Sequence, residues 1–353
     1  MAKVLMKGNE VIAEAAIHSG CKYFFGYPIT PQSELVAYMA RRLPEVDGLF
    51  LQAESEVAAI NMVYGAASAG VRVMTSSSSP GFSLKQEGIS FLAGAELPAV
   101  LVNIARGGPG LGNIQPSQSD YFQATKGGGH GDYYTPVLAP STLQEIVELT
   151  EVAFNLADQY RTPVILMGDG MLGQMMEPVE FSTEQLQAMP NKDWATTGTR
   201  GDGAPRVITS LQLNDVNLEN HNHKLQKKYE LIKQKEARYD TYRAEDAEYF
   251  VVAYGTVSRI AKNAIDAARK KGLKVGMIRP ITLWPFPEQA FFEYRNMAKS
   301  FLTVEMNTGQ MVEDVRLAVN GKAPVSFFGR TGGVIPNQSE ILEAIINLAG
   351  GEQ

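Results

Sequence analysis

The sequence predicts an α/β protein in which a doubly wound domain is followed by a smaller α/β domain. Apolar runs alternate with helical patterns along most of the chain, as expected for strands joined by crossover helices. The run 98–105 is apolar apart from Asn103, which is typical of a strand covered on both faces. Residues 248–278 then read strand, helix, strand, which is a βαβ unit.

Length and composition indicate a soluble globular protein of two domains. A chain of 353 residues is too long for one small core. We expect a first domain over 1–185, a linker with an exposed helix over 186–246, and a second domain over 247–353. The net charge of −6, without a basic block, argues against a nucleic-acid partner. The one cysteine, Cys21, excludes a cysteine-ligated iron–sulfur cluster within this chain.

The start of the sequence and its hydropathy predict a cytoplasmic protein. The first ten residues lack the apolar core and cleavage site of a signal peptide. No apolar run approaches the roughly 20 residues of a membrane span. We therefore expect no membrane association.

The first chemical candidate follows a short predicted strand at 23–26. The loop after it contains Pro28, Ile29, Thr30 and Pro31, and its two prolines make it rigid. Thr30 has two interpretations: a helix-start residue that satisfies backbone groups, or a hydroxyl that faces a cleft. The residues alone favour the first.

The second candidate is a carboxylate at the start of a helix. An apolar run at 48–51 ends in a polar break, and Ser55 is well placed to cap the helix that follows. Glu56 then lies in the first turn, at the carboxyl end of the preceding strand. In open α/β sheets ligands bind at that edge. The competing interpretation is an ordinary acid favoured by the helix dipole.

A serine-rich turn and an arginine come next. We expect a strand at 71–74, a turn over 75–82 whose hydroxyls could line an anion or amide site, and a helix over 83–95. Arg106 follows the buried strand 98–105, where a guanidinium could hold a carboxylate through two hydrogen bonds. A surface arginine without a function, which happens to precede a loop, is an equally good interpretation.

Three further positions carry weaker signals. His130 lies in a glycine-rich loop, where an acid/base role is possible but uncommon. Asp169 lies in Gly-Asp-Gly, the start of a thiamine diphosphate metal motif, but the paired asparagines that complete it are missing. We interpret Asp169 as a turn residue and assign no metal. The segment 255–258 is a weak phosphate-loop candidate because it lacks the full glycine spacing.

Several motifs then line up in one order, and together the chain resembles the alpha subunit of 2-oxoacid:ferredoxin oxidoreductases nearly end to end. Tyr-Pro-Ile-Thr-Pro with a downstream Arg-Gly-Gly-Pro is highly specific for that family. The opening 4–10 and the Pro31-Gln32 variant look most like the branched-chain (2-oxoisovalerate) enzymes, with the 2-oxoglutarate enzymes as near neighbours. The motifs lie at 8–10, 26–31, 54–56, 75–83, 106–109 and 279–287.

The resemblance implies a specific fold and cofactor. The first domain would be a thiamine diphosphate-binding domain of the pyrimidine type, and the second would resemble the transketolase C-terminal domain. A separate beta subunit would supply the diphosphate- and Mg²⁺-binding half. Glu56 aligns with the family's cofactor-activating glutamate, with Pro28 and Ile29 beside the cofactor. Thr30 and Arg106 align with residues that hold the substrate.

The resemblance also implies partners and a reaction. The reaction would be oxidative decarboxylation of a 2-oxoacid, with coenzyme A taking the acyl group and ferredoxin the electrons. Gamma and ferredoxin-like delta subunits, or their equivalents, would carry the 4Fe-4S clusters. The best expectation for the substrate is 2-oxoisovalerate, with 2-oxoglutarate or pyruvate as alternatives. A scaffolding subunit with a vestigial site and a non-oxidative thiamine decarboxylase or synthase are the rival interpretations.

Overall fold

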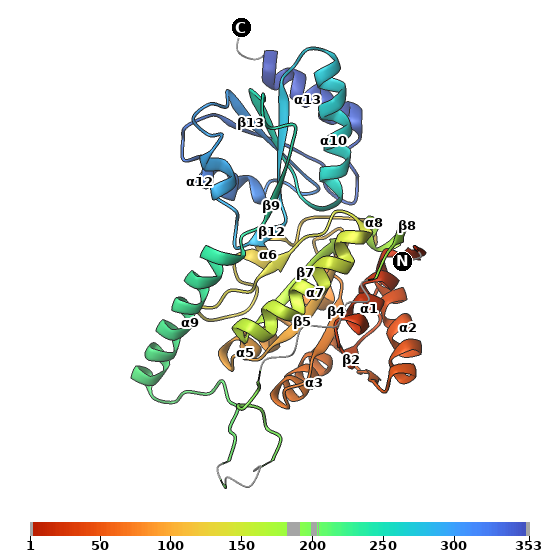
Figure 1. Cartoon of the computed structure of the whole chain (residues 1–353), viewed down its shortest axis with the longest axis vertical. Helices are drawn as coiled ribbons and strands as arrows, with labels where there is room; N and C mark the ends of the chain where they lie inside the picture. The colour runs from red at the N-terminus through yellow and green to blue at the C-terminus, as the bar shows by residue number, and fades with distance from the viewer. Residues whose placement is uncertain (1–2, 182–190, 199–202, 204, 351–353) are drawn as a thin grey trace.

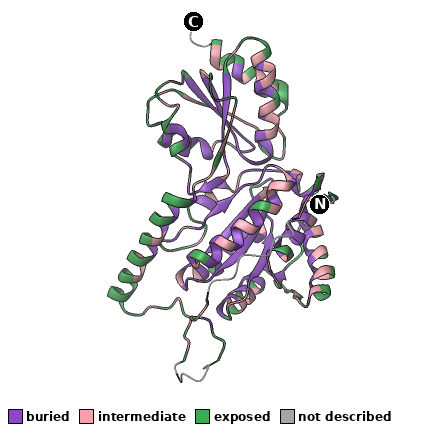
Figure 2. Cartoon of the chain, viewed as in Figure 1, coloured by how far each residue is buried: buried purple, intermediate pink, exposed green. Residues whose placement is uncertain are grey.

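The computed structural model describes residues 3–181, 191–198, 203 and 205–350. It contains a seven-stranded sheet and a five-stranded sheet, each flanked by helices, and a separate two-stranded sheet. Figure 1 shows the unit built on the five-stranded sheet stacked above the larger one, with β9 and β12 at the boundary. Most of the strands in both sheets are buried (Figure 2).

The larger sheet has the strand order β12-β6-β7-β5-β4-β2-β3. Neighbouring strands are parallel except for the edge pair β12–β6. Every residue of β4 and β5 is buried, as a strand between two layers of helices requires. The strands are β2 (Tyr23–Gly26), β3 (Leu49–Gln52), β4 (Val73–Ser77), β5 (Ala99–Ala105), β6 (Val137–Leu138), β7 (Pro163–Asp169) and β12 (Thr282–Trp284).

The helices pack around this sheet in two groups. Helix α1 (Gly8–His18) packs against α2 (Ser33–Arg42) and α7 (Leu143–Tyr160), whereas α3 (Glu56–Ser68) packs against α5 (Gln86–Gly94). This arrangement confirms the α/β fold predicted from the alternating pattern. Shorter helices are η1 (Leu43–Val46), α4 (Ser79–Leu84), α6 (Tyr121–Thr125) and α8 (Gly170–Gln174).

The serine-rich segment differs from the prediction. The expected turn over 75–82 is replaced by the end of β4, which runs to Ser77, and by α4, which begins at Ser79. Polar residues can lie in this buried strand because neighbours bond to them: Thr75 accepts from Lys85, and Ser76 donates to Gln32. The helix expected over 83–95 is correspondingly split, with α4 ending at Leu84 and α5 starting at Gln86.

The smaller sheet has the order β14-β13-β10-β11-β9, with β9 antiparallel to β11. Figure 1 shows α10 (Gly255–Lys270) and α13 (Gln338–Gly350) on one face and α12 (Met311–Val319) on the other, and α11 (Gln289–Phe292) is a short helix that contacts α12. The strands are β9 (Tyr239–Tyr242), β10 (Tyr249–Val252), β11 (Val275–Pro280), β13 (Ser300–Glu305) and β14 (Val325–Gly329).

The predicted linker over 186–246 is partly structured. Its long helix, α9 (Asp215–Glu236), is largely exposed and buries Leu225, Tyr229 and Ile232 (Figure 2). Strand β9 also falls within this range, so the sheet of the second unit begins before residue 247. Residues 186–190, 199–202 and 204 of the linker lie outside the described residues.

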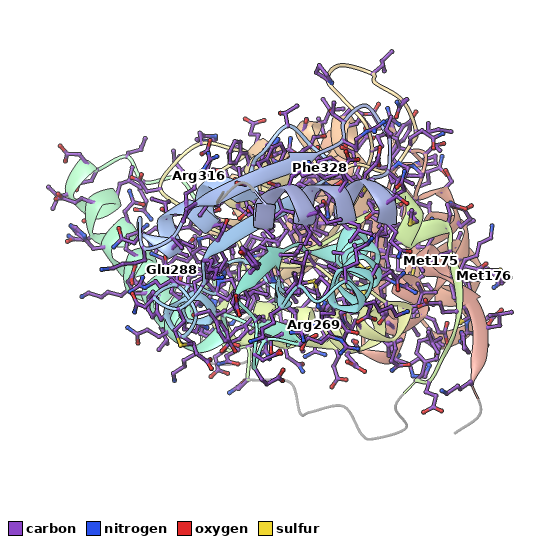
Figure 3. The ribbon with its side chains drawn as sticks, turned by 90° about the horizontal axis from the view of Figure 1, so that it is seen from above. Met175, Met176, Arg269, Glu288, Arg316 and Phe328 are labelled. Atoms are coloured by element: carbon purple, nitrogen blue, oxygen red, sulfur yellow. The ribbon has the colours of Figure 1, made fainter. Side chains whose placement is uncertain are left out.

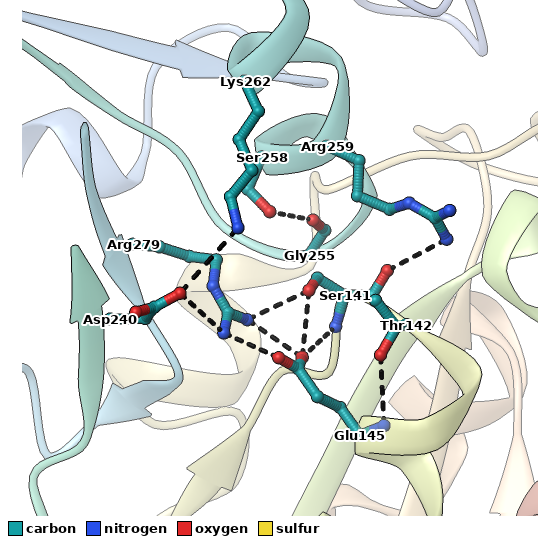
Figure 4. A network of polar contacts seen from close by, with 9 residues as sticks. All are labelled: Ser141, Thr142, Glu145, Asp240, Gly255, Ser258, Arg259, Lys262 and Arg279. Atoms are coloured by element: carbon teal, nitrogen blue, oxygen red, sulfur yellow. Dashed lines mark hydrogen bonds and ion pairs between the residues drawn. The ribbon is translucent and has the colours of Figure 1, made fainter. Parts of the chain in front are cut away.

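A partly buried ion pair joins the two units (Figure 4). Arg279, on β11, donates to both carboxylate oxygens of Glu145 on α7, at 2.7 and 2.9 Å. Its Nη1 also donates to the Ser141 hydroxyl at 3.1 Å. Strand β12 then joins the larger sheet beside β6. The second unit therefore contributes both a strand and a charged contact to the first.

The small third sheet pairs β1 (Val4–Lys7) with β8 (Met176–Val179) in an antiparallel register. Seen from above, Met176 lies at the margin of the molecule (Figure 3), and it is exposed. Across the described residues, no helix combines the length and the hydrophobicity that a membrane span needs.

Candidate active site

The site candidates lie where the parallel strands of the larger sheet end. The strand register places Gly26 of β2 opposite Gln52 of β3, and Ser77 of β4 opposite Asn103 of β5. The loops that follow these strands therefore emerge at one edge. This edge is where an open α/β sheet binds its ligands.

The proline loop after β2 is held by hydrogen bonds from three elements. Gln32 is fully buried and accepts from Ser76 on β4 at 2.6 Å. The carbonyl of Pro31 accepts from Asn9 at 2.8 Å and from Gln174 at 3.2 Å. These bonds fix the backbone of the loop and leave the side chain of Thr30 at the surface.

Glu56 is the first residue of α3 and is 5% exposed. The hydroxyl of Ser55 caps the helix by accepting from the backbone N–H of Ala58 at 3.2 Å, as the sequence predicted. Among the described residues, no donor bonds to the Glu56 carboxylate. Neither carboxylate oxygen is among the fully buried polar atoms that lack a partner, so the group remains accessible at the ligand-binding edge. A carboxylate there that no donor of the described residues occupies is a candidate to bind a ligand.

Gly81 explains how the Glu56 carboxylate fits against α4. A Cβ atom at position 81 would lie 2.3 Å from Oε1 of Glu56 and 2.3 Å from Oγ of Ser77. Glycine is thus required by close approach. Ser77 Oγ is itself buried without a hydrogen-bond partner among the described residues. A carboxylate and a free hydroxyl therefore lie together beside a backbone that carries no side chain.

Arg106 follows β5 and is 8% exposed. Its Nη1 donates to the carbonyl of Thr30 at 2.8 Å, and its Nη2 donates to the carbonyl of Leu111 at 3.2 Å. Its Nε is buried and has no partner among the described residues. The guanidinium, with five donors, braces two loops and retains N–H groups for a further acceptor.

Helix α4 connects the part of the site that holds Glu56 with the part that holds Arg106. The hydroxyl of Ser79 accepts from the backbone N–H of Arg106 at 3.0 Å and donates to Asp120 at 2.7 Å. Asp120 also accepts from Asn103 at 2.9 Å. Burial raises the pKa of the Asp120 carboxyl, and the bonds from Ser79 and Asn103 oppose that rise. Glu56 packs against the same helix at Gly81, so α4 fixes the position of Glu56 relative to Arg106.

A groove of about 370 Å³ opens beside this helix. Ser79, Gly108 and Asp120 line it from the first unit, and Gln310 and Thr331 line it from the second. The loop that carries Arg106 therefore faces a space bounded by both units.

Two other candidates are occupied by structural contacts, although Asp169 ends β7 opposite Ala105 at the same edge of the sheet. His130 is exposed, and its ring stacks edge-on against Phe91 at 6.2 Å between centroids. Asp169 caps α8 by accepting from two backbone N–H groups, and it accepts from Thr256 of the second unit at 2.6 Å. Burial raises the pKa of the Asp169 carboxyl. The phosphate-loop candidate is likewise engaged, because Ser258 donates to the carbonyl of Gly255.

Sequence reasoning missed Lys85, which is fully buried between α4 and α5. A signal was available: Lys85 continues the helical spacing of the buried residues Phe82, Ile89 and Leu92, and thus lies on an apolar face. Gly81 could not be singled out, because its role depends on the approach of a side chain 25 positions away.

Comparison with known proteins decides the family. The model described as "Pyruvate flavodoxin/ferredoxin oxidoreductase, thiamine diP-bdg" matches residues 14–247. A second model, "Pyruvate:ferredoxin oxidoreductase core domain II", matches residues 247–341. The chain belongs to the pyruvate flavodoxin/ferredoxin oxidoreductase family.

Two curated relatives extend over the full chain. The chain is 51% identical over 350 residues to the ketoisovalerate oxidoreductase subunit VorB of Methanothermobacter marburgensis, covering 99% of each. It is 36% identical over 370 residues to the 2-oxoglutarate synthase subunit KorA of Methanothermobacter thermautotrophicus, covering 97% of this chain and 98% of the relative. The expected resemblance to 2-oxoacid:ferredoxin oxidoreductase subunits of the branched-chain type is confirmed.

A solved structure of the same family shares the fold. The 2-oxoglutarate:ferredoxin oxidoreductase from Magnetococcus marinus, with 2-oxoglutarate, coenzyme A and succinyl-CoA bound, matches with a TM-score of 0.88 and 26% identity. The match covers 98% of this chain and 65% of that longer chain. The first unit is thus the thiamine diphosphate-binding domain of this oxidoreductase family, and the second is its core domain II. Because the relatives are named as subunits, this oxidoreductase chain is one component of a multi-subunit complex.

Proposed function

We propose that this chain supplies the aminopyrimidine-binding half of a thiamine diphosphate site in a 2-oxoisovalerate:ferredoxin oxidoreductase. The observation that carries the proposal is Glu56, which is 5% exposed, packs against Gly81 at the ligand-binding edge and has a carboxylate without a partner among the described residues. The reaction is the oxidative decarboxylation of 2-oxoisovalerate to its acyl-CoA, with release of CO₂ and transfer of electrons to ferredoxin.

The residues of this edge fit an aminopyrimidine ring. Thiamine diphosphate supplies a carbon nucleophile and holds the electrons of the cleaved bond. Glu56 would hold a proton against a nitrogen of the bound ring, which is general acid–base work by a positioned carboxyl group. The exposed Pro28 and the half-buried Ile29 would contact the cofactor from the rigid loop. The absence of a side chain at Gly81 leaves room for this contact.

Arg106 and Thr30 hold the substrate. The free Nε of Arg106 and its remaining N–H groups bind the 2-oxoacid carboxylate through charge-assisted hydrogen bonds. The exposed hydroxyl of Thr30 adds a neutral donor beside it. Since the guanidinium is already fixed on two carbonyls, it orients the carboxylate at little entropic cost.

Partner subunits complete the site and carry the electrons. A beta subunit binds the diphosphate and Mg²⁺, because Asp169 of the incomplete motif is engaged in capping α8 and binding Thr256. Gamma and ferredoxin-like delta subunits carry the 4Fe-4S clusters. Cys21, the single cysteine here, is buried, and burial raises the pKa of its thiol to about 12, so it stays protonated.

The branched-chain substrate is supported by the higher identity to the ketoisovalerate oxidoreductase subunit, 51% against 36% for the 2-oxoglutarate synthase subunit. Turnover of the reconstituted complex on 2-oxoisovalerate, 2-oxoglutarate and pyruvate, with coenzyme A and ferredoxin, tests this assignment. A higher kcat/KM for 2-oxoglutarate or pyruvate would reject the branched-chain substrate.

The Glu56→Gln variant tests the central role. In the reconstituted complex we expect turnover to fall by about 10²–10⁴-fold, as is usual for loss of a positioned acid–base group. Assembly, followed by size-exclusion chromatography, should be unchanged. The matched control is Glu54→Gln, two residues earlier and exposed, which should retain turnover. Near-normal turnover of Glu56→Gln would favour the rival view of a scaffolding subunit.

A further inference from the structure

The second unit has an edge of the kind at which open α/β sheets bind ligands. Strands β10 and β13 are parallel neighbours, and the helices that follow them, α10 and α12, lie on opposite faces of the sheet (Figure 1). The carboxyl ends of β10 and β13 therefore form a topological switch point, which is where such sheets bind their ligands. In this chain the position is taken by a residue of the first unit, Gln118.

Gln118 is buried, and its amide bonds to the ends of both strands. Its Nε2 donates to the carbonyl of Tyr254, just after β10, at 3.0 Å, and its Oε1 accepts from the backbone N–H of Met306, just after β13, at 3.0 Å. Its own N–H donates to the carbonyl of Met306 at 3.0 Å, and its carbonyl accepts from Asn307 at 2.9 Å. The side chain thus satisfies buried backbone groups that would otherwise lack a partner.

The phosphate-loop candidate at 255–258 begins beside this side chain. Gly255 has a φ of +53°, in the left-handed region that favours glycine. A Cβ atom there would lie 3.4 Å from Nε2 of Gln118, so the amide lies within contact distance of the first turn of α10. An amide of the first unit therefore lies where a phosphate loop would hold an anion.

Gln118 belongs to the segment that supports the main chain of Arg106. Pro116 forms an isolated antiparallel bridge with Arg106. Asp120 accepts from the hydroxyl of Ser79, and the same hydroxyl accepts from the backbone N–H of Arg106. Gln118 lies midway between these two supports in the sequence. A displacement of Gln118 would therefore be transmitted to both of them.

We infer that Gln118 is a positioning residue for the reaction, which fixes the second unit against the segment that supports Arg106. The second unit thereby sets where the guanidinium stands. A displacement of about 1 Å in a group that orients a substrate can lower the rate by about 10²-fold. The inference rests on the substrate contact proposed for Arg106.

The Gln118→Met variant tests the inference in the full chain. Methionine keeps the length of the side chain but leaves the carbonyl of Tyr254 and the N–H of Met306 buried without this partner. Such groups are costly to bury, so we expect the segment around Gln118 to loosen.

Hydrogen–deuterium exchange of the full chain measures the loosening without substrate or cofactor. In the wild type the backbone N–H of Arg106 donates to Ser79, and that of Gly107 donates to the carbonyl of Gln115. We expect amides in the peptide that spans 106–120 to exchange about tenfold faster in Gln118→Met, the effect of about one lost hydrogen bond on local stability.

Kinetics of the reconstituted complex then test whether the positioning matters for the substrate. Gln118→Met should raise the KM for the 2-oxoacid by about five- to tenfold, as expected for a weakened charge-assisted hydrogen bond. In the Arg106→Lys background the same change should have a smaller effect, because both substitutions act on one contact. A residue that only stabilises the fold would give the same effect in both backgrounds.

The matched control is Glu145→Gln, which weakens a different contact between the two units. The Glu145 carboxylate bonds to Arg279 and Ser141 rather than to the segment around Gln118. This variant should leave both the exchange of the peptide 106–120 and the KM unchanged. If Gln118→Met fails to fold, Gln118→Asn gives the same readouts, because its amide is one methylene too short to keep both bonds.

The outcomes distinguish this inference from the proposed function. Unchanged exchange in the Gln118 variants overturns the inference, and so does an equal effect on KM in the wild-type and Arg106→Lys backgrounds. An unchanged KM in Arg106→Lys itself overturns the proposed substrate contact instead. The exchange measurement then still decides whether Gln118 holds the segment that supports Arg106.

Discussion

The guanidinium of Arg106 donates a 2.8 Å hydrogen bond to the main-chain carbonyl of Thr30, across 76 positions of sequence. The two residues proposed to hold the substrate are therefore joined before any substrate binds. The contact uses the backbone of Thr30, which leaves its hydroxyl free. One side chain thus sets the position of the loop after β2 relative to the loop after β5.

Arg106→Lys should raise the KM for the 2-oxoacid by about 10- to 100-fold, as expected for one lost charge-assisted hydrogen bond. A lysine keeps the charge but cannot bond to Thr30, Leu111 and a carboxylate with a planar fork. Steady-state kinetics of the reconstituted complex measure the change. Arg295→Lys is a suitable control, because Arg295 also donates to a carbonyl, that of Ala318, in the second unit. A KM of Arg106→Lys equal to that of the wild type would contradict the proposed contact between Arg106 and the substrate carboxylate.

Gly81→Ala should reduce turnover of the complex strongly while the chain remains folded. The added methyl group would lie 2.3 Å from Oε1 of Glu56, so the carboxylate or α4 has to move. We expect a loss of about 10²-fold or more. Gly65→Ala on α3 is the control, because a Cβ atom there meets nothing within 4 Å. Full activity of Gly81→Ala would show that the close packing of Glu56 is not required.

Glu145→Gln should destabilise the junction between the two units by about 1–3 kcal/mol, because it leaves Arg279 buried with a weaker partner. Urea unfolding of the full chain measures this loss. Glu148→Gln, on the exposed side of the same helix, provides the comparison and should change stability by less than about 0.5 kcal/mol. If Glu145→Gln and Glu148→Gln lose the same free energy of unfolding, the pair of Glu145 and Arg279 has no special role in stability.

The same pair predicts a pH dependence. Burial alone would raise the pKa of the Glu145 carboxyl, but Arg279 and the donors of Ser141 outweigh it and hold the pKa below 4.5. The folded state therefore binds this proton less readily than the unfolded state. The contribution of Glu145 to stability is present above pH 4.5 and is lost as the pH falls through the lowered value. Unfolding midpoints between pH 3 and 6 should converge for wild type and Glu145→Gln at the acidic end.

Local sequence patterns were sufficient for the fold class and for placing Thr30, Glu56 and Arg106 at strand ends and helix starts, whereas the roles expected of these residues came from the family resemblance. Alternating apolar runs and helical spacing predicted the main strands, and Ser55 predicted the start of α3 with Glu56 in its first turn. The short strands β6, β9 and β12 carried too little periodicity to be predicted. The polar residues Thr75 and Ser76 were predicted to lie in a turn. They lie in a buried strand because Lys85 and Gln32 bond to their hydroxyls, and a local sequence pattern does not reveal those partners.

The sequence by itself determined which residues stand at strand ends and helix starts, because a cap, a proline or a run of apolar side chains acts over a few positions. Only the tertiary structure decided that Arg106 bonds to the backbone of Thr30, that Gly81 makes room for Glu56, and that Lys85 is buried against Thr75. Those relationships depend on strand order and register, which bring together segments tens of residues apart, and no local pattern encodes the distance between two side chains on different strands.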